Sequence, residues 1–438
     1  FDQTEKHSRI SRMATEQARQ LHNEQSVHAM LQACSNGDLA LVQSYLQQSR
    51  QFSNPPLAAS LQDEKTGISP LMAAAEGGHL DLCRLLLEEG APWNAIDRKG
   101  KCAGNYATEK QSWDVVNLLV DSGTKAELIL GAAIRNSMGN GTLESHLSSV
   151  NGSKKGPVEH EPCTKPDYLS KKVRYDAANT TLLDEDDDAV MMEWERPLMK
   201  AHASIITGNS QKGKSVMNIG FGLGIIDGAL QELDVALHVI VEAHPTVYQK
   251  MINDGWDKKP NVRICFGRWQ DELPKLLNEG VKFDGIFYDT YGEHFTDLED
   301  FHQIMAKMLN KPNGIYSFFN GLAPDNLFFH GVACQCVKLQ LAQLGLDSEF
   351  APCEIQVKEK EWDGIRRKYW HGRDTYYLPI ITWNNDFIVK EHFQNAQTNV
   401  MDANSDKRVH DSSLSGGDDQ HTKKVKNGLF MNKIIAIT

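Results

Sequence analysis

Three glycines and a carboxylate in the middle of this chain have the types and spacing of a nucleotide-binding site. Gly220, Gly222 and Gly224 directly follow a short apolar segment, and Glu242 ends the next one, 22 residues after Gly220. Glycines let the backbone turn sharply and approach a ligand, because no Cβ stands in the way. A carboxylate at the end of the second strand can accept hydrogen bonds from both hydroxyls of a ribose. The glycine pattern by itself would also suit a dinucleotide.

Two further acidic residues are candidates for substrate chemistry. Asp289 ends the apolar run 283–288, and Glu195 lies in residues 191–199, where a helix is expected to begin. Glu195, Met199 and His202 fall at i, i+4 and i+7, on one helical face. Core packing is the plainer interpretation of that face. A carboxylate on a semi-apolar face needs a cationic partner, however, and the sequence assigns none, so a ligand cation remains open.

The elements that must position these residues alternate between strand and helix. Alternating strands and helices predict a parallel sheet with helices on both faces, and ligands then bind at the carboxyl ends of the strands. Two later strand-like segments predict a terminal antiparallel hairpin. That hairpin, and the acidic character of the site, favour an α/β class I S-adenosylmethionine methyltransferase fold over a dinucleotide dehydrogenase. The expected strands are residues 216–219, 237–241, 262–266, 283–288, 314–319, 345–358 and 376–383.

Length and charge limit the remaining possibilities. The 438 residues suggest two domains plus tails. The formal net charge of −12 argues against direct nucleic-acid or membrane-surface binding and permits a basic partner. Eight scattered cysteines fit a reducing compartment and predict no metal site, and we find no run of 18 apolar residues.

An all-α array of ankyrin repeats is expected at residues 27–131. The segment 69–91 closely resembles one ankyrin repeat, and Asp114 follows Asp81 by 33 residues, the ankyrin period. An earlier copy at residues 31–46 makes about three repeats, near the minimum for a stable stack. Such an array can support the neighbouring domain or dock a partner on its concave surface, and the sequence favours neither.

The remaining segments are expected to be mostly irregular. The acidic run 184–188 is expected to be a solvated loop, with attraction of a basic substrate as a minor alternative. The predicted organisation is a polar N-terminal segment at 1–26, the repeats, a linker at 132–168, a methyltransferase domain at 169–383 and a polar, disordered tail at 384–438.

Several motifs of the second domain resemble known enzymes. Segments 175–180, 192–197, 220–222 and 283–290 resemble guanidinoacetate methyltransferase. The fuller resemblance, over roughly residues 27–383, is to the protein arginine delta-N-methyltransferase family, which joins ankyrin-like repeats to the same catalytic domain. The motifs that carry it are Val190–Glu195, Asn218–Asp227, Glu242–Pro245, Asp254–Trp256, Gly267–Gln270, Tyr288–Thr290, Phe318–Leu322 and Tyr376–Tyr377.

The resemblance implies S-adenosylmethionine as cofactor and a role for each matching residue. Glu195 and Asp289 would be catalytic and grip a guanidinium. Asn218 departs from the wider methyltransferase pattern, which often has an acidic residue there. The cofactor would be held by Tyr175, Met199, Gly220, Phe221, Gly222, Leu223, Gly224, Ile225, Ile226 and Asp227, by Glu242, Ala243, His244 and Pro245 on the ribose side, by Arg268, Trp269 and Gln270 around the adenine, and by Asp289.

The implied activity is methylation of the delta guanidino nitrogen of arginine in a protein. The repeats favour a protein substrate, and family analogy suggests a ribosomal protein and a cytoplasmic and nuclear location. A small-molecule guanidino methyltransferase is the main alternative. An ankyrin adaptor with an inactive methyltransferase domain is a third hypothesis, and a dinucleotide oxidoreductase a fourth.

Overall fold

The computed structural model describes residues 24–51, 53–138, 164–208, 213–293, 295–370 and 374–388. Residues 1–23 of the expected N-terminal segment, 139–163 of the expected linker and 389–438 of the expected tail lie outside this part of the chain. The contacts divide the chain into two compact units, one ending at Gly123 and the other comprising Thr124–Ile388. Each unit is described by itself.

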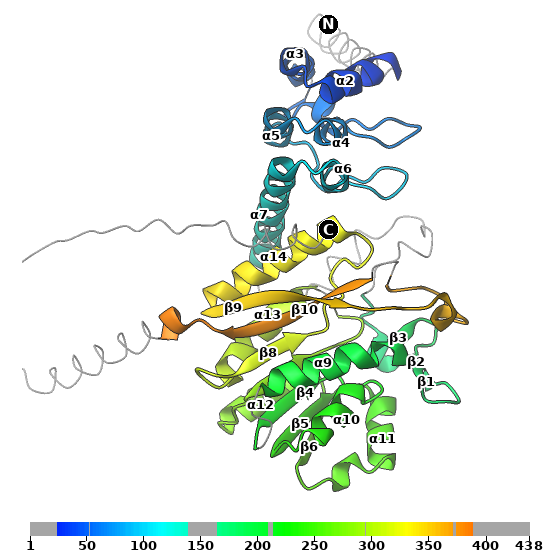
Figure 1. Ribbon diagram of the computed structural model, residues 1–438, viewed down its shortest axis with the longest axis vertical. Helices are drawn as coiled ribbons and strands as arrows, with labels where there is room; N and C mark the ends of the chain where they lie inside the picture. The colour runs from blue at the N-terminus through cyan, green and yellow to red at the C-terminus, as the bar shows by residue number, and fades with distance from the viewer. Residues whose placement is uncertain are drawn as a thin grey trace, which may run out of the picture. The chain divides into compact units, whose positions relative to one another are not determined.

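The first unit is built from paired helices (Figure 1). Ser69 caps α4 by accepting a hydrogen bond from the Met72 N–H at 3.2 Å, and Pro70 occupies the first turn, where its missing N–H costs nothing. Helix α7 begins in this unit and continues beyond Gly123 to Met138, past residue 131, where the sequence predicts the repeats to end. The helices are α2 (Glu24–Asn36), α3 (Leu39–Arg50), η1 (Leu57–Ser60), α4 (Pro70–Glu76), α5 (Leu80–Glu88), α6 (Ala103–Glu109) and α7 (Trp113–Met138).

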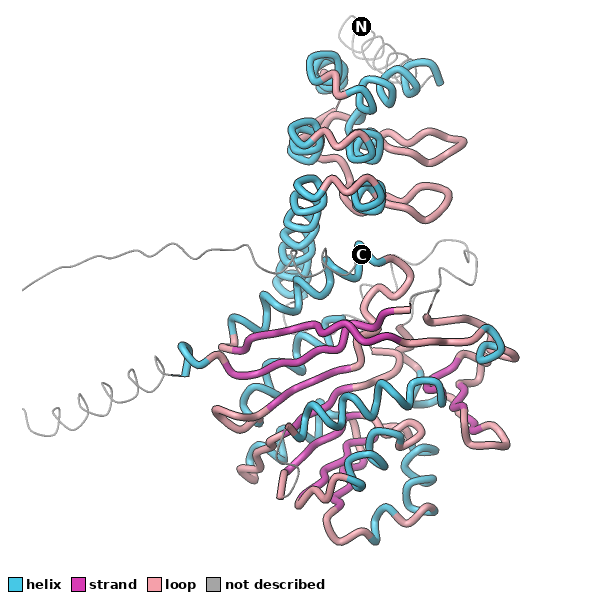
Figure 2. Tube along the Cα trace, viewed as in Figure 1, coloured by secondary structure: helices cyan, strands magenta, loops and turns pink. Residues whose placement is uncertain are grey.

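The second unit contains a sheet whose strands are magenta in Figure 2. It has seven strands in the order β6-β5-β4-β7-β8-β10-β9. Strands β6 to β8 are parallel, whereas β10 is antiparallel to both β8 and β9. These pairings confirm the predicted parallel sheet with a terminal antiparallel hairpin. The strands are β4 (Ser215–Ile219), β5 (Leu237–Glu242), β6 (Val262–Phe266), β7 (Gly285–Tyr288), β8 (Ile315–Phe318), β9 (Leu346–Glu354) and β10 (Thr375–Trp383).

Helices cover both faces of this sheet. Successive side chains of a strand point to opposite faces, so Phe287 packs with α9 and α10 whereas Tyr288 stacks near Phe301 of α13. The apolar surface buried on the two faces is the core of the unit. The helices are α9 (Arg196–Thr207), α10 (Ile225–Glu232), α11 (Pro245–Asn253), α12 (Trp269–Asn278), α13 (Phe295–Met308) and α14 (Leu327–Gln343), with single turns η3 (Tyr168–Ser170), η4 (Glu193–Glu195), η5 (Trp256–Lys258) and η6 (Glu359–Trp362).

A small antiparallel sheet of β1 (Arg174–Tyr175), β2 (Thr181–Leu183) and β3 (Ala189–Met192) precedes α9. The expectation that a helix begins near Met191 is therefore wrong for the first residues of that segment. Met191 and Met192 pair with β2, and α9 begins only at Arg196. Pro197 explains the start, because proline is tolerated in the first turn of a helix and not in its interior.

The acidic run 184–188 is only partly the solvated loop that its composition predicts. Asp184 and Asp188 are buried, with 1% and 3% exposure. The Lys165 ammonium bonds to both of these carboxylates and to Asp186, and Arg366 pairs with Asp188. Local composition could not predict this burial, because the neutralising cations come from distant parts of the chain.

Candidate active site

Gly220 and Asp289 meet where the order of the strands reverses. Strand β4 lies between β5 and β7, and the chain runs outward through β5 and β6 before it returns to β7. Ligands of such sheets bind at this switch point, beyond the carboxyl ends of the strands. Gly220 has a φ of +88°, and a Cβ built on it would lie 1.9 Å from the Asp289 carbonyl oxygen. Only glycine fits here.

The loop after β4 is held from two sides. The Phe221 N–H donates to Glu242 Oε2 at 2.9 Å, and the Tyr175 hydroxyl donates to the Gly222 carbonyl at 3.0 Å. A Cβ on Gly222 would lie 2.7 Å from Met191 Sδ. The small sheet and β5 thus fix the course of the glycine turn that leads into α10.

Glu242 lies at the end of β5, as predicted, and is 7% exposed. Its Oε1 accepts a 2.6 Å hydrogen bond from the His244 N–H. Burial raises the pKa of the Glu242 carboxyl to about 7, against the lowering effect of its backbone hydrogen bonds. Each carboxylate oxygen has a second lone pair, so Glu242 can still accept from a ligand hydroxyl.

Glu195 occupies the turn before α9 and is 3% exposed. Its Oε1 accepts hydrogen bonds from the Met192 N–H at 2.9 Å and from the Tyr369 hydroxyl. Burial and the charge of Asp289 raise the pKa of the Glu195 carboxyl to about 8, against these hydrogen bonds. Within the described residues no donor reaches Oε2, which leaves this oxygen for a ligand.

Asp289 follows β7 and is partly exposed. Desolvation raises the pKa of its carboxyl to about 7. No Lys, Arg or His of the described ranges forms an ion pair with Glu195, Glu242 or Asp289. A buried carboxylate without a cation is costly, so Glu195, with the charge of Asp289 near it, is complementary to a positively charged ligand.

Asp227, by contrast, lies in the core. It is 0% exposed, and its carboxylate accepts from Asn218 Nδ2 at 2.9 and 3.0 Å and lies 3.0 Å from His238 Nε2. Asn218 Nδ2 also donates to the Gly220 carbonyl at 2.8 Å, so Asn218 and Asp227 hold the glycine turn from the core side. The side chains of Met199, Ile225 and Ile226 are likewise buried, and the structure brings none of these four to an accessible surface.

His244 and Pro245 organise the start of α11. His244 Nδ1 accepts from the Thr246 N–H, which fixes the tautomer, and Nε2–H donates to the Lys171 carbonyl at 3.0 Å. Burial lowers the pKa of His244. Of the residues next to Glu242, Ala243 is partly exposed and Pro245 is exposed.

Glu293 accepts hydrogen bonds from Trp269 and Gln270, two of the three residues predicted to surround an adenine. Its carboxylate accepts from Trp269 Nε1 at 3.0 Å, Gln270 Nε2 at 3.2 Å, the Tyr288 hydroxyl at 2.5 Å and the Thr290 hydroxyl at 2.8 Å. The indole of Trp269 is 6% exposed, whereas the neighbouring Arg268 is exposed. Glu293 could not be predicted from the sequence, because no local pattern shows that four donors converge on it.

A second missed group is the hydrogen-bond chain through His202. Burial lowers the pKa of His202 to about 3, so the ring is neutral. The Asn320 N–H donates to the Tyr376 oxygen at 2.7 Å, and the Tyr376 hydroxyl donates to His202 Nε2 at 3.0 Å. His202 Nδ1–H then donates to the Ser317 oxygen at 2.7 Å, and Ser317 donates to the Pro379 carbonyl at 2.5 Å. Every donor has an acceptor, and His202 is a core residue that ties α9 to β8 and β10.

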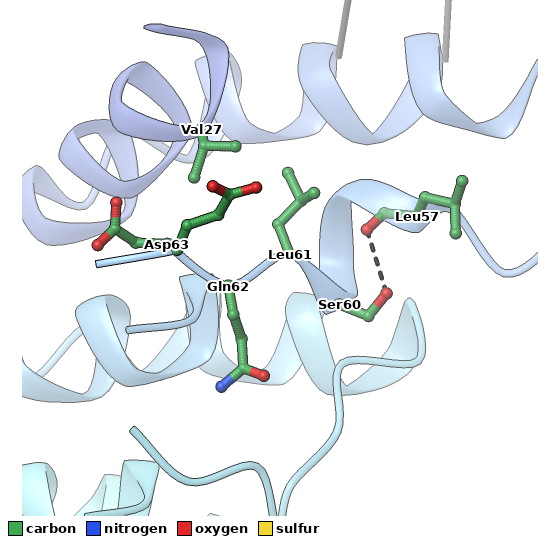
Figure 3. Close-up of a pocket in the computed structure, with 7 residues that line it drawn as sticks. Val27, Leu57, Ser60, Leu61, Gln62 and Asp63 are labelled. Atoms are coloured by element: carbon green, nitrogen blue, oxygen red, sulfur yellow. Dashed lines mark hydrogen bonds between the residues drawn. The ribbon is translucent and has the colours of Figure 1, made fainter. Parts of the chain in front are cut away.

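The first unit contains a recess, lined by residues of α2 and of the segment 57–64 (Figure 3). Its volume is about 150 Å³. Clefts that hold drug-sized ligands measure roughly 300–1,000 Å³, so this recess is too small for a nucleotide. In the described residues we find no cluster of His, Cys, Asp and Glu arranged to hold a metal ion, and no helix long and apolar enough to cross a bilayer.

The sheet order, the terminal hairpin and the switch-point site together define a class I methyltransferase fold preceded by ankyrin repeats. The guanidinoacetate N-methyltransferase family matches residues 158–330, and ankyrin repeats match residues 30–129. Methyl transfer requires a methyl donor, and ankyrin repeats are a means of protein–protein contact.

Curated relatives extend this similarity over most of the chain. Protein arginine N-methyltransferase 2 of Candida glabrata is 35% identical, over an aligned region that makes up 69% of this chain and 79% of the relative. The Aspergillus oryzae protein of the same name is 31% identical, over 81% of this chain and 96% of the relative. The Saccharomyces cerevisiae protein is 34% identical, over 69% of this chain and 78% of the relative. This chain belongs to the protein arginine N-methyltransferase 2 family and is a methyltransferase.

Proposed function

We propose that this protein transfers the methyl group of S-adenosylmethionine to the delta guanidino nitrogen of arginine in a protein substrate. The observation that carries the proposal is the pair Glu195 and Asp289. Both carboxyls have raised pKa values, and neither has a cationic partner among the described residues. A guanidinium supplies the missing positive charge.

The residues present fit the proposed cofactor. Gly220 and Gly222 form a turn too tight for any Cβ, which sets the backbone at the switch point, and Glu242 lies at the strand end where a ribose would be held. The acidic surroundings also suit the positive sulfonium. When bound, S-adenosylmethionine would supply an electrophilic methyl group on that sulfonium. The side chains that border the adenine remain a prediction, with Arg268 exposed and Trp269 and Gln270 held by Glu293.

The two carboxylates would orient and activate the guanidinium. This group is a poor nucleophile, because its pKa exceeds about 12 and its lone pairs are delocalised. Carboxylates can hold it in a bidentate fork and draw positive charge onto the nitrogens they contact. Glu195 would clamp it through Oε2, the oxygen that Met192 and Tyr369 leave open. Asp289 would polarise it and accept the proton, as a general base.

Alignment is the main task of such a site. The transfer is an in-line displacement, and correct orientation of two reactants is worth ~7–11 kcal/mol of barrier. Gly220 brings the cofactor loop against the backbone of Asp289 itself. The same contact therefore sets the position of the glycine turn and of Asp289, the proposed base.

A protein is the proposed substrate, rather than a free guanidino compound. The repeats and the names of the relatives, which are protein arginine methyltransferases, support this choice. The guanidinoacetate N-methyltransferase match keeps a small substrate as the second candidate. The delta position, a ribosomal protein as substrate and a cytoplasmic and nuclear location remain predictions.

The test is incubation of the purified chain with labelled S-adenosylmethionine and a cell extract, with an Asp289→Asn preparation as control. Products are separated by size, and the labelled protein is hydrolysed to amino acids. Label in delta-monomethylarginine is the expected result. Label only in a small guanidino compound would favour the second candidate, and no label despite cofactor binding would overturn the assignment.

A further inference from the structure

The connection between β9 and β10 supplies a hydrogen-bond donor to Glu195. Tyr369, in this connection, donates its hydroxyl hydrogen to Glu195 Oε1. Its ring packs between Trp194 and Trp362, at centroid distances of 5.8 and 5.2 Å. Because the Met192 N–H bonds to the same oxygen, Tyr369 helps to decide which oxygen of Glu195 is left open.

Asp188 fixes this connection beside the site. Arg366 Nε lies 2.9 Å from Asp188 Oδ1, and Arg366 Nη2 bonds to Oδ2, which makes a bidentate pair. The Arg366 N–H also donates to the Asp187 carbonyl at 3.0 Å. Asp188 is 3% exposed, so this pair is less screened by water than a surface ion pair. Arg366 stands shortly before Tyr369 in the chain and limits where its hydroxyl can point.

The same acidic loop also contacts the segment that follows Asp289. Asp184 accepts a 3.0 Å hydrogen bond from the Tyr291 hydroxyl, and Lys165 bridges Asp184 and Asp188, with 2.8 Å between its ammonium and Asp188. The loop 184–188 thus joins the segment that carries Tyr369 to the segment that carries Asp289.

We propose that the loop 184–188 is a positioning device for the two carboxylates. Asp188 acts through Arg366 to hold Tyr369 on Glu195 Oε1, so that Oε2 faces the substrate. This inference rests on the proposed function, because it needs a guanidinium as the group that Oε2 receives. Tyr369 and Arg366 are positioning residues in this proposal, since Tyr369 acts through Glu195 and Arg366 acts through Tyr369.

The groups that face Glu195 determine what a pH profile would report. Asp289 raises the pKa of the Glu195 carboxyl, and the hydrogen bonds from Tyr369 and Met192 lower it. Tyr376, on β10, is also close enough to interact electrostatically with Glu195 and is itself bonded to His202, which is neutral. Loss of the Tyr369 hydroxyl therefore raises the pKa of Glu195 further and shifts the acid limb of the activity profile upward.

The experiment compares the pH dependence of kcat/KM for arginine methylation in four full-length forms, namely the natural chain, Tyr369→Phe, Arg366→Gln and the double variant. Each single variant should shift the acid limb upward by about one to two pH units, as loss of one hydrogen bond to a charged group predicts. Turnover should fall at least about fivefold, and cofactor affinity should change less than about twofold. The double variant should equal Tyr369→Phe, because Arg366 acts through Tyr369.

Lys368→Gln is the matched control. It removes the same charge from the same segment, but Lys368 pairs with Glu359, which is 88% exposed, so the profile should not move. Additive shifts in the double variant, or an unshifted acid limb in Arg366→Gln, would overturn the proposal. Asp188→Asn gives an independent second test, and thermal melting identifies a variant that fails to fold. Failure of the proposed function would appear earlier, as absence of arginine methylation by the natural chain.

Discussion

A Cβ on Gly220 would lie 1.9 Å from the carbonyl oxygen of Asp289. The backbone proposed to hold the cofactor therefore touches the backbone of the residue proposed to act on the substrate. Strands β4 and β7 are hydrogen-bonded neighbours, and the Asp289 N–H donates to the Ile219 carbonyl at 3.0 Å, so the contact is rigid. This contact therefore couples the positions of the proposed cofactor turn and of the proposed general base.

Gly220→Ala should therefore damage both the fold and the activity. The new methyl would collide with backbone that cannot move aside, and φ at +88° is strained for any residue with a Cβ. We expect a loss of more than about 2 kcal/mol in the free energy of unfolding, measured by denaturant titration. Gly228→Ala is the control in the adjoining helix, because a Cβ there meets nothing within 4 Å. It should stabilise by about 0.5–1 kcal/mol, and equal losses in both variants would contradict the argument.

Asp289→Asn and Glu195→Gln should separate chemistry from cofactor binding. Each change keeps the shape of the side chain and removes the charge that holds a guanidinium. Turnover should fall by about 10²- to 10⁴-fold for Asp289→Asn, as for loss of a general base. S-adenosylmethionine affinity, measured by calorimetry, should stay within about threefold because Glu242 and the glycine turn are unchanged. Near-normal turnover in both variants would show that other groups bind and activate the guanidinium.

Activity should rise with pH between about 6 and 8. The pKa values of Asp289 and Glu195 are raised to about 7 and about 8, so both carboxyls hold protons at the low end of this range. Only the ionised forms attract a guanidinium, whose own charge does not change here. The profile of kcat/KM should show an acid limb in this window, and Asp289→Asn should remove its lower component. A flat profile from pH 6 to 8 would argue against these two groups.

Stability should change in the opposite direction. A carboxyl whose pKa is raised on folding binds more protons in the folded state, so stability falls as pH rises from its ordinary pKa to its folded pKa. For Glu195 this window runs from 4.5 to about 8, and for Glu242 from 4.5 to about 7. The free energy of unfolding should fall by at least about 2 kcal/mol from pH 5 to pH 8, and Glu195→Gln should reduce this loss. An identical pH slope in Glu195→Gln would rule out its contribution.

An exchange of Asn218 and Asp227 should be tolerated better than either single change. Asn218→Asp places two carboxylates in a site that is 0% exposed, which should cost about 3 kcal/mol or more. Asn218→Asp combined with Asp227→Asn restores one charge and one amide, and should recover at least about half of that loss. Denaturation of the three variants measures the coupling. Additive losses would show that the pair does not interact as the geometry indicates.

The sequence by itself determined the strands, the repeats and the ends of the strands. Hydrophobic periodicity and the glycines that end an element are local properties. The strands ending at Ile219, Glu242 and Tyr288 could therefore be predicted within a few residues. Parallel strands bring their carboxyl ends to one edge, and Gly220, Glu242 and Asp289 could be placed there together on that ground.

Only the tertiary structure decided which side chains face the site and which support it. Asp227 matches a cofactor motif and lies in the core, whereas Glu293 and Tyr369 match no pattern and bond to predicted site residues. The acidic run 184–188 is polar by composition, and it is partly buried because cations distant in sequence neutralise it. The physical reason is common to these cases. The state of a polar side chain depends on partners that the fold brings from elsewhere in the chain, and local patterns contain no information about them.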